Sequence, residues 1–264
     1  MMIIDAHCHI YPDKIAEKAS AATGRFYDIP MALDGKVSTL RREGAAAGIT
    51  HFVVQSVATT PAQVSSINRF IAESVAQSGG TMTGLGTLHP DSTDLKGDVE
   101  QILELGLKGV KLHPDIQGFK LDDYRCLKIY ELCEGRLPLL IHTGDHRYDF
   151  SNPNRLIPIL NIYSGLTVIG AHFGGWSIWE KATEELYRYP RLYVDCSSSL
   201  YGISPETGRA LCRRYGAERV LFGTDYPMWS PKEELERFFA MGLTPEENEQ
   251  ILWKNAARLF DIAL

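Results

Sequence analysis

Residues 137–144 read LPLLIHTG, a short aliphatic run that ends in a histidine, a threonine and a glycine. Because apolar side chains stand at successive rather than alternate positions, the run is typical of a parallel strand buried on both faces. Runs of the same kind, each ended by polar or Gly- and Pro-rich residues, recur along the chain. They predict eight strands, at residues 2–9, 50–57, 82–89, 109–114, 137–144, 166–173, 191–197 and 219–225.

Helices are predicted between these strands, and three of them have explicit start signals. The segments 60–63 (TPAQ), 230–233 (SPKE) and 244–247 (TPEE) place Ser or Thr at the cap, Pro first and Gln or Glu third, as capping boxes do. Shared among eight units, the 264 residues give about 33 each, enough for a strand, a helix and two loops. The sequence therefore predicts an α/β protein, a single (β/α)8 TIM barrel forming one domain over residues 1–264.

The first unit departs from this pattern. About 40 residues separate the first predicted strand from the second, many more than one helix needs. Within them, residues 22–36 (ATGRFYDIPMALDGK) contain the Gly, Pro and Asp that favour irregular structure, and residues 37–48 (VSTLRREGAAAG) follow as a helix. We expect a long excursion after strand one that forms a lid.

The composition excludes several classes of partner. The 27 Lys and Arg residues against 33 Asp and Glu give a net charge of −6, the wrong sign for binding nucleic acid or anionic lipid. The chain has no apolar run of membrane-spanning length and no signal-peptide pattern at its start. Its five scattered cysteines predict reduced thiols. We therefore expect a cytoplasmic protein that acts on a small molecule, with a homodimer as an open alternative to a monomer.

Histidines gather where the predicted strands end. Six of the eight do so, namely His7, His9, His89, His113, His142 and His172. In a barrel, the carboxyl ends of the strands form the face on which enzymes assemble their chemistry. His7 and His9 point to the same side of one strand, and Asp225 ends the last strand, so these side chains can converge. Imidazoles together with a carboxylate favour zinc.

Four segments together resemble a known family. They are IIDAHCHI (3–10), IHTG (141–144), IGAHFGGW (169–176) and FGTDYP (222–227), in the same order along the barrel. The sequence resembles the amidohydrolase superfamily, in the amidohydrolase-related branch that contains aminocarboxymuconate-semialdehyde decarboxylase, and the resemblance extends over all eight units. It implies one divalent metal, expected to be Zn²⁺, held by His7, His9, His142 and Asp225. It also implies that His172 is catalytic, although in other branches the corresponding histidine is itself a ligand.

Five further residues are predicted to bind the substrate. His113 shares a side of its strand with Lys111, and a hydrogen bond that stabilises the loop is its alternative role. At the position of Lys111, two-metal members of the superfamily carry a carboxylated lysine. We interpret Lys111 as a contact for a substrate anion or as a buried ion-pair partner, with a two-metal site as the alternative. Arg147 and Arg25 suit recognition of a carboxylate, and Trp176 suits the wall of a pocket.

The predicted activity is that of a metal-dependent hydrolase acting on a small, carboxylated substrate with a C–N or C–O bond. A zinc-activated water would attack, with Asp225 as the acceptor of its proton and then as the donor to the leaving group. The alternatives are a zinc-dependent carboxy-lyase or a hydratase built on the same site. A barrel that binds no metal is the third class, and it requires the polar strand ends to have no function.

Overall fold

Parallel strands form two sheets in the computed structural model, which describes residues 2–263. The first sheet has the order β1 (Ile4–His9), β2 (His51–Gln55) and β3 (Met82–Gly84). The second runs in chain order through β4 (Gly86–Thr87), β5 (Val110–Leu112), β6 (Leu139–Ile141), β7 (Val168–Gly170), β8 (Leu192–Asp195) and β9 (Val220–Leu221). All eight predicted strands are confirmed, and the third is divided into β3 and β4.

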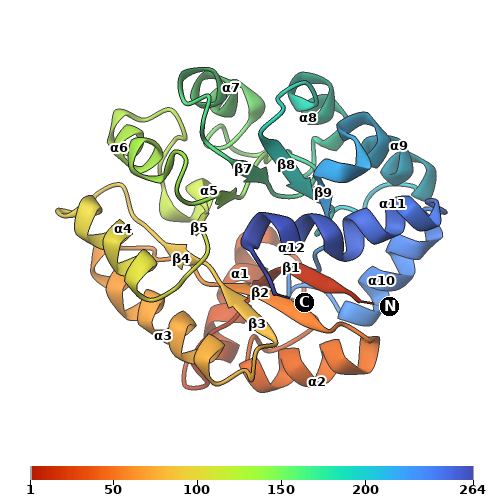
Figure 1. Ribbon diagram of the computed structural model, residues 1–264, viewed down its shortest axis with the longest axis horizontal. Helices are drawn as coiled ribbons and strands as arrows, with labels where there is room; N and C mark the ends of the chain where they lie inside the picture. The colour runs from red at the N-terminus through yellow and green to blue at the C-terminus, as the bar shows by residue number, and fades with distance from the viewer. Residues whose placement is uncertain (1, 264) are drawn as a thin grey trace.

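Backbone hydrogen bonds join the two sheets into a closed ring. The Leu85 N–H donates to the Val54 carbonyl at 2.9 Å, and the next N–H, of Gly86, donates to the Gly109 carbonyl at 2.9 Å. On the other side of the ring, the Ala6 N–H donates to the Phe222 carbonyl at 2.9 Å. The predicted (β/α)8 TIM barrel is thus confirmed (Figure 1).

Helices surround the ring of strands (Figure 1). They are α2 (Val37–Ala47), α3 (Val64–Ala76), α4 (Leu95–Glu104), α6 (Tyr124–Cys133), α7 (Pro153–Ile162), α8 (Trp179–Leu186), α9 (Pro205–Tyr215) and α10 (Pro231–Ala240). Shorter elements are η1 (Pro61–Gln63), α5 (Pro114–Gln117), η2 (Ala217–Arg219), α11 (Pro245–Glu249), the π-helical η3 (Gln250–Lys254) and α12 (Asn255–Phe260). No helix within residues 2–263 is both long and apolar enough to cross a membrane.

Two of the three predicted capping boxes form. Gln63 and Glu247 each return a side-chain oxygen to the backbone N–H of the cap residue, at 3.2 and 2.8 Å. Ser230 precedes α10 as predicted, but its side chain makes no capping hydrogen bond, and the carboxylate of Glu233 lies 3.5 Å from Arg237. The prediction of a box at 230–233 was wrong because Glu233 pairs along the helix instead.

The long excursion is more regular than predicted. Helix α1 spans Ala16–Tyr27, so residues 22–27 are helical rather than irregular. The helix ends at Asp28, whose backbone adopts the left-handed conformation (φ 56°) and whose N–H caps the Gly24 carbonyl. Irregular backbone then connects it to α2, which begins at Val37 as expected. The excursion therefore brings a helix, rather than a loose loop, over one end of the barrel.

Apolar side chains close the opposite end of the barrel. Inward-facing strand residues such as Ile4, Val53, Leu140 and Ile169 form one cluster with Phe260 of α12. A larger cluster fills the space between the strands and the outer helices. The five cysteines are free and buried, in agreement with the expected thiols. The polar site is thus confined to the end where the strands finish.

Candidate metal centre

His7 and His9 lie together at the end of β1. Their Nε2 atoms are 3.2 Å apart, and each lies close to Oδ1 of Asp225, at 3.4 and 3.5 Å. Gly223 permits this approach, since a Cβ at that position would lie 2.9 Å from the Cβ of His7. Asp225 itself has a left-handed backbone (φ 55°), which L-residues rarely adopt and which turns its carboxylate toward β1.

Buried hydrogen bonds orient this cluster from behind. The Nδ1–H of His7 donates to Oδ2 of Asp195 at 3.0 Å, which leaves the Nε2 lone pair facing Asp225. The Ser198 hydroxyl donates to Oδ2 of Asp225 at 2.6 Å and accepts from Nε1 of Trp229 at 2.8 Å. Such partners fix the rotamer and tautomer of metal ligands.

The donor set fits a divalent metal ion. The ligand atoms of His7, His9 and Asp225 lie within 4.8 Å of one another. Burial, followed by the charge of Lys111, holds the pKa of both imidazoles well below the ordinary value, so both are neutral as metal ligation requires. Burial also raises the pKa of Asp225 to about 7, against the hydrogen bond from Ser198.

His142 stands beside this cluster rather than within it. Its ring stacks on His113 with centroids 4.0 Å apart, and the two group with Asp115. Its Nδ1 lies 3.2 Å from Nε2 of His172, whose Nδ1–H donates to the Ser197 carbonyl at 2.9 Å. The predicted role of His142 as a fourth ligand stays a prediction, as does the catalytic role of His172.

Lys111 projects into the same space from the middle of β5. The side chain is fully buried, and its Nζ donates to Nε2 of His7 at 3.1 Å. Burial lowers its pKa to about 8. Within residues 2–263 it has no carboxylate within ion-pair distance.

A cavity of about 550 Å³ opens above these groups. Its lining includes seven residues from the strand ends: His7, His9, Lys111, His113, His142, His172 and Asp225. Tyr27, from the excursion, covers one side. Because Nδ1 of His113 accepts from the Ile116 N–H, its Nε2–H donates to the Tyr27 oxygen, at 2.7 Å. The excursion thus covers the site, as expected of a lid.

The amidohydrolase family profile matches residues 4–262. The chain belongs to the amidohydrolase family. Among solved structures, a TIM-barrel protein of Bordetella bronchiseptica is 24% identical, with a TM-score of 0.82 and 99% of both chains covered. No curated protein matches the sequence significantly.

Two further solved structures have similar folds. One is described as a putative 2-pyrone-4,6-dicarboxylic acid hydrolase from Pseudomonas putida, 22% identical, with a TM-score of 0.68 over 99% of this chain and 98% of that one. The other is a dihydroxybenzoic acid decarboxylase from a Polaromonas species, with bound manganese and the inhibitor 2-nitroresorcinol. It is 15% identical, with a TM-score of 0.73 over 98% of this chain and 96% of that one. These likenesses support the amidohydrolase barrel.

Three predicted substrate contacts of this amidohydrolase do not line the cavity. The guanidinium of Arg147 pairs with Asp145 at 2.8 Å and donates to the Phe26 carbonyl at 2.8 Å, so it is already engaged. Arg25 is exposed and lines a separate groove on the other side of α1. Trp176 packs against Tyr27, with ring centroids 5.0 Å apart, behind the cavity wall. Arg147 and Trp176 therefore support α1, and Arg25 faces outward; their role in substrate binding stays a prediction.

Several residues of the site were missed at the level of sequence. Asp195 ends the apolar run of β8, and an acidic residue in that position was the one signal for it. Tyr27 lies in a segment whose pattern indicates loop structure, and Ser198 indicates only a loop hydroxyl. Each acquires its role through partners more than 25 positions away in the sequence.

Proposed function

We propose that this amidohydrolase is a metal-dependent carboxy-lyase that removes CO2 from a small unsaturated or aromatic acid. The observation that carries the proposal is the set of contacts made by the two carboxylate oxygens of Asp225. Its Oδ1 faces His7 and His9, and its Oδ2 accepts the Ser198 hydroxyl. Both oxygens therefore already have a polar partner within the site, which favours Asp225 as a holder of the ion over Asp225 as the acceptor of a proton from an attacking water, the role that the hydrolase mechanism gives it. The geometry suits Asp225 as a ligand.

The other groups match the needs of a decarboxylation. The carbon–carbon bond to the carboxylate breaks, its electrons stay on the substrate, and a proton takes the place of the departing CO2. Lys111 would pair with the substrate carboxylate. His172 lines the cavity and is the proposed proton carrier. Its Nδ1–H is bound to the Ser197 carbonyl, so Nε2 would take a proton from solvent water and pass it to the carbon, giving up its 3.2 Å contact with Nδ1 of His142. A divalent ion held by His7, His9 and Asp225 would act as an electrophile that polarises substrate oxygens.

Matched proteins also support this proposal. The Polaromonas structure is a decarboxylase with a bound metal, and two further matches are 2,6-dihydroxybenzoate decarboxylases. We propose Zn²⁺ as the ion because two imidazoles and a carboxylate suit it, with manganese as the second candidate. Elemental analysis of the purified protein distinguishes the two.

A hydrolase is the second candidate, favoured by the match to the putative Pseudomonas hydrolase. The decisive experiment incubates the metal-loaded protein with aromatic carboxylates, lactones and amides, and measures released CO2 and newly formed acid separately. CO2 release is expected. The same assay on Asp225→Asn should show measurable CO2 release in proportion to the metal retained, whereas a general base would lose about 10² to 10⁴ in rate. Acid formation without CO2 would overturn the lyase proposal.

A further inference from the structure

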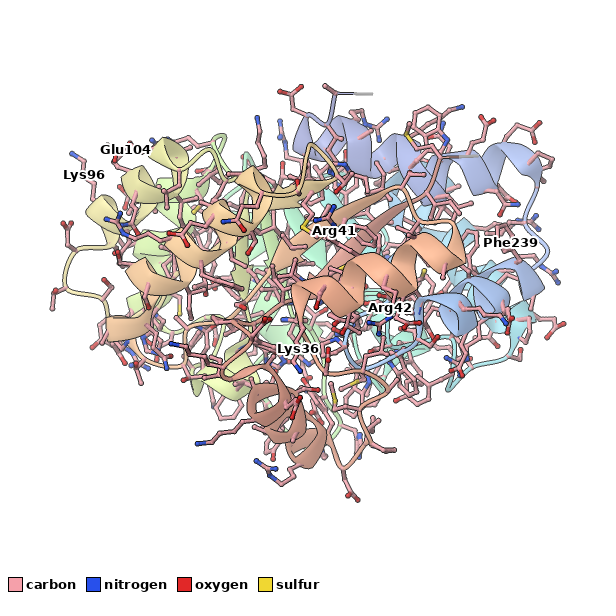
Figure 2. The ribbon with its side chains drawn as sticks, turned by 90° about the horizontal axis from the view of Figure 1, so that it is seen from below. Lys36, Arg41, Arg42, Lys96, Glu104 and Phe239 are labelled. Carbon is pink, nitrogen blue, oxygen red and sulfur yellow. The ribbon has the colours of Figure 1, made fainter. Side chains whose placement is uncertain are left out.

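Helix α1 presents an apolar face to the cavity. Ile15, Ala19, Ala22 and Phe26 all line it, and their spacing of four, three and four residues places them on one face of the helix. This face is only partly covered by protein, and Ile15 is 50% exposed. In Figure 2, which views the molecule from the side, α1 lies at the lower edge, away from the body of the barrel.

A second apolar wall faces the cavity from α3. Ile67 and Phe70 line it one turn apart. Thr23 of α1 and Ser66 of α3 also line the cavity, so these two walls are mainly apolar and uncharged, while the strand ends below them are polar. When a ligand covers apolar surface inside a cavity, its binding becomes more favourable in proportion to the apolar area removed from water.

Charge is scarce in this cavity and confined to the strand ends. Lys111 is the only Lys or Arg among its lining residues, and Asp225 is the only acidic one. A buried ammonium group without an ion pair is costly, and an anionic ligand supplies the missing partner. Lys111 balances one carboxylate beside the ion proposed at His7, His9 and Asp225. A second carboxylate placed against α1 or α3 would meet no cation there, only apolar side chains and the hydroxyls of Thr23 and Ser66.

The volume of the cavity bears on the size of the ligand. A cavity of about 150 Å³ holds one benzene molecule. The volume of about 550 Å³ therefore exceeds the needs of a single-ring acid.

Building on the function proposed above, we propose that the substrate is a monocarboxylic acid with an extended apolar body of at least two rings, or a chain of similar size. Its carboxylate pairs with Lys111, and its body lies between α1 and α3. Size and single charge together define the class, which excludes single-ring acids and dicarboxylates as preferred substrates.

Calorimetric titration of the metal-loaded protein tests this assignment without any turnover. The probes are benzoate, biphenyl-4-carboxylate, biphenyl-4-carboxamide and biphenyl-4,4′-dicarboxylate. We expect biphenyl-4-carboxylate to bind at least about tenfold more tightly than benzoate, because the second ring buries further apolar area. The amide and the dicarboxylate should each bind about tenfold or more weakly than the monocarboxylate.

Variants locate the two halves of the ligand. Lys111→Met should abolish the preference for the acid over the amide, and retained amide binding would show that the variant is folded. Ala19→Phe fills the space beside α1 and should weaken biphenyl-4-carboxylate about tenfold while leaving benzoate unchanged. Ala21→Phe is the matched control, since Ala21 lies on the same helix but lines the groove on its other side.

The outcomes separate this inference from the proposed function. Equal affinity for benzoate and biphenyl-4-carboxylate, preference for the dicarboxylate, or an Ala19→Phe variant indistinguishable from Ala21→Phe would each overturn it. If the binding pattern holds and no CO2 is released from any acid, the lyase proposal fails while the ligand class stands. If CO2 is released equally well from single-ring acids, the lyase proposal stands while the ligand class fails.

Discussion

Replacing Ser198 with Ala should weaken metal binding without unfolding the barrel. The Ser198 hydroxyl is the group that holds Oδ2 of Asp225, at 2.6 Å, and so directs Oδ1 toward His7 and His9. A hydrogen bond to a charged group contributes about 1.5 to 3 kcal/mol, which corresponds to a factor of roughly 10 to 150 in an equilibrium constant. Loss of a partner behind a metal ligand typically costs about 10- to 100-fold in affinity. We therefore expect the dissociation constant to rise by about 10- to 100-fold.

The measurement is competition for Zn²⁺ against a chelator of known affinity, with the apo and loaded melting temperatures recorded on the same preparation. Ser199→Ala is the matched control, because the Ser199 hydroxyl donates to the Ser197 carbonyl at 2.9 Å and makes no hydrogen bond to Asp225. A Ser198→Ala variant that binds zinc as tightly as the parent, or no more weakly than Ser199→Ala, would refute the positioning role.

Three further outcomes are expected. The purified protein should contain about one equivalent of a divalent ion, and His7→Ala and His9→Ala should each lose it to a chelator that leaves the parent loaded; full retention in both would show that this pair is structural. Glu234 is buried, and burial raises its pKa from 4.5 to about 7, so the native state resists ionisation of this carboxyl group. The free energy of unfolding of the parent should therefore fall relative to that of Glu234→Gln as the pH rises from 4.5 to 7. The expected difference in the free energy of unfolding, measured in urea, is on the order of 3 kcal/mol. If the unfolding free energies of the parent and Glu234→Gln change with pH in parallel, the prediction is contradicted. Arg147→Ala removes the bond to the Phe26 carbonyl and should speed proteolytic cleavage within residues 16–36 several-fold while the melting temperature changes little; unchanged cleavage would count against Arg147 as the residue that holds α1.

The sequence by itself determined the barrel and the end of the barrel that carries the site. Strand positions follow from local apolar runs, and an alternation of two residues places His7 and His9 on one side of β1, because side-chain direction in a strand depends only on backbone geometry. The same local rules located the starts of the helices at Pro61, Pro231 and Pro245. They failed for residues 22–27, where Gly24 is tolerated inside α1 and Asp28 ends the helix.

Only the tertiary structure decided which of the strand-end residues meet. Two neighbouring strands can bring their last side chains to different sides of the mouth, so the sequence could not group His142 with His113 rather than with His7. Nor could it show that Arg147 pairs with Asp145 and donates to the Phe26 carbonyl, or that the Ser198 hydroxyl donates to Oδ2 of Asp225. Most of these contacts join segments far apart in the chain. Each of them changes which chemical role the side chain can take in the site. Periodicity specifies on which face a side chain lies, whereas the partner it finds there depends on how the whole ring closes.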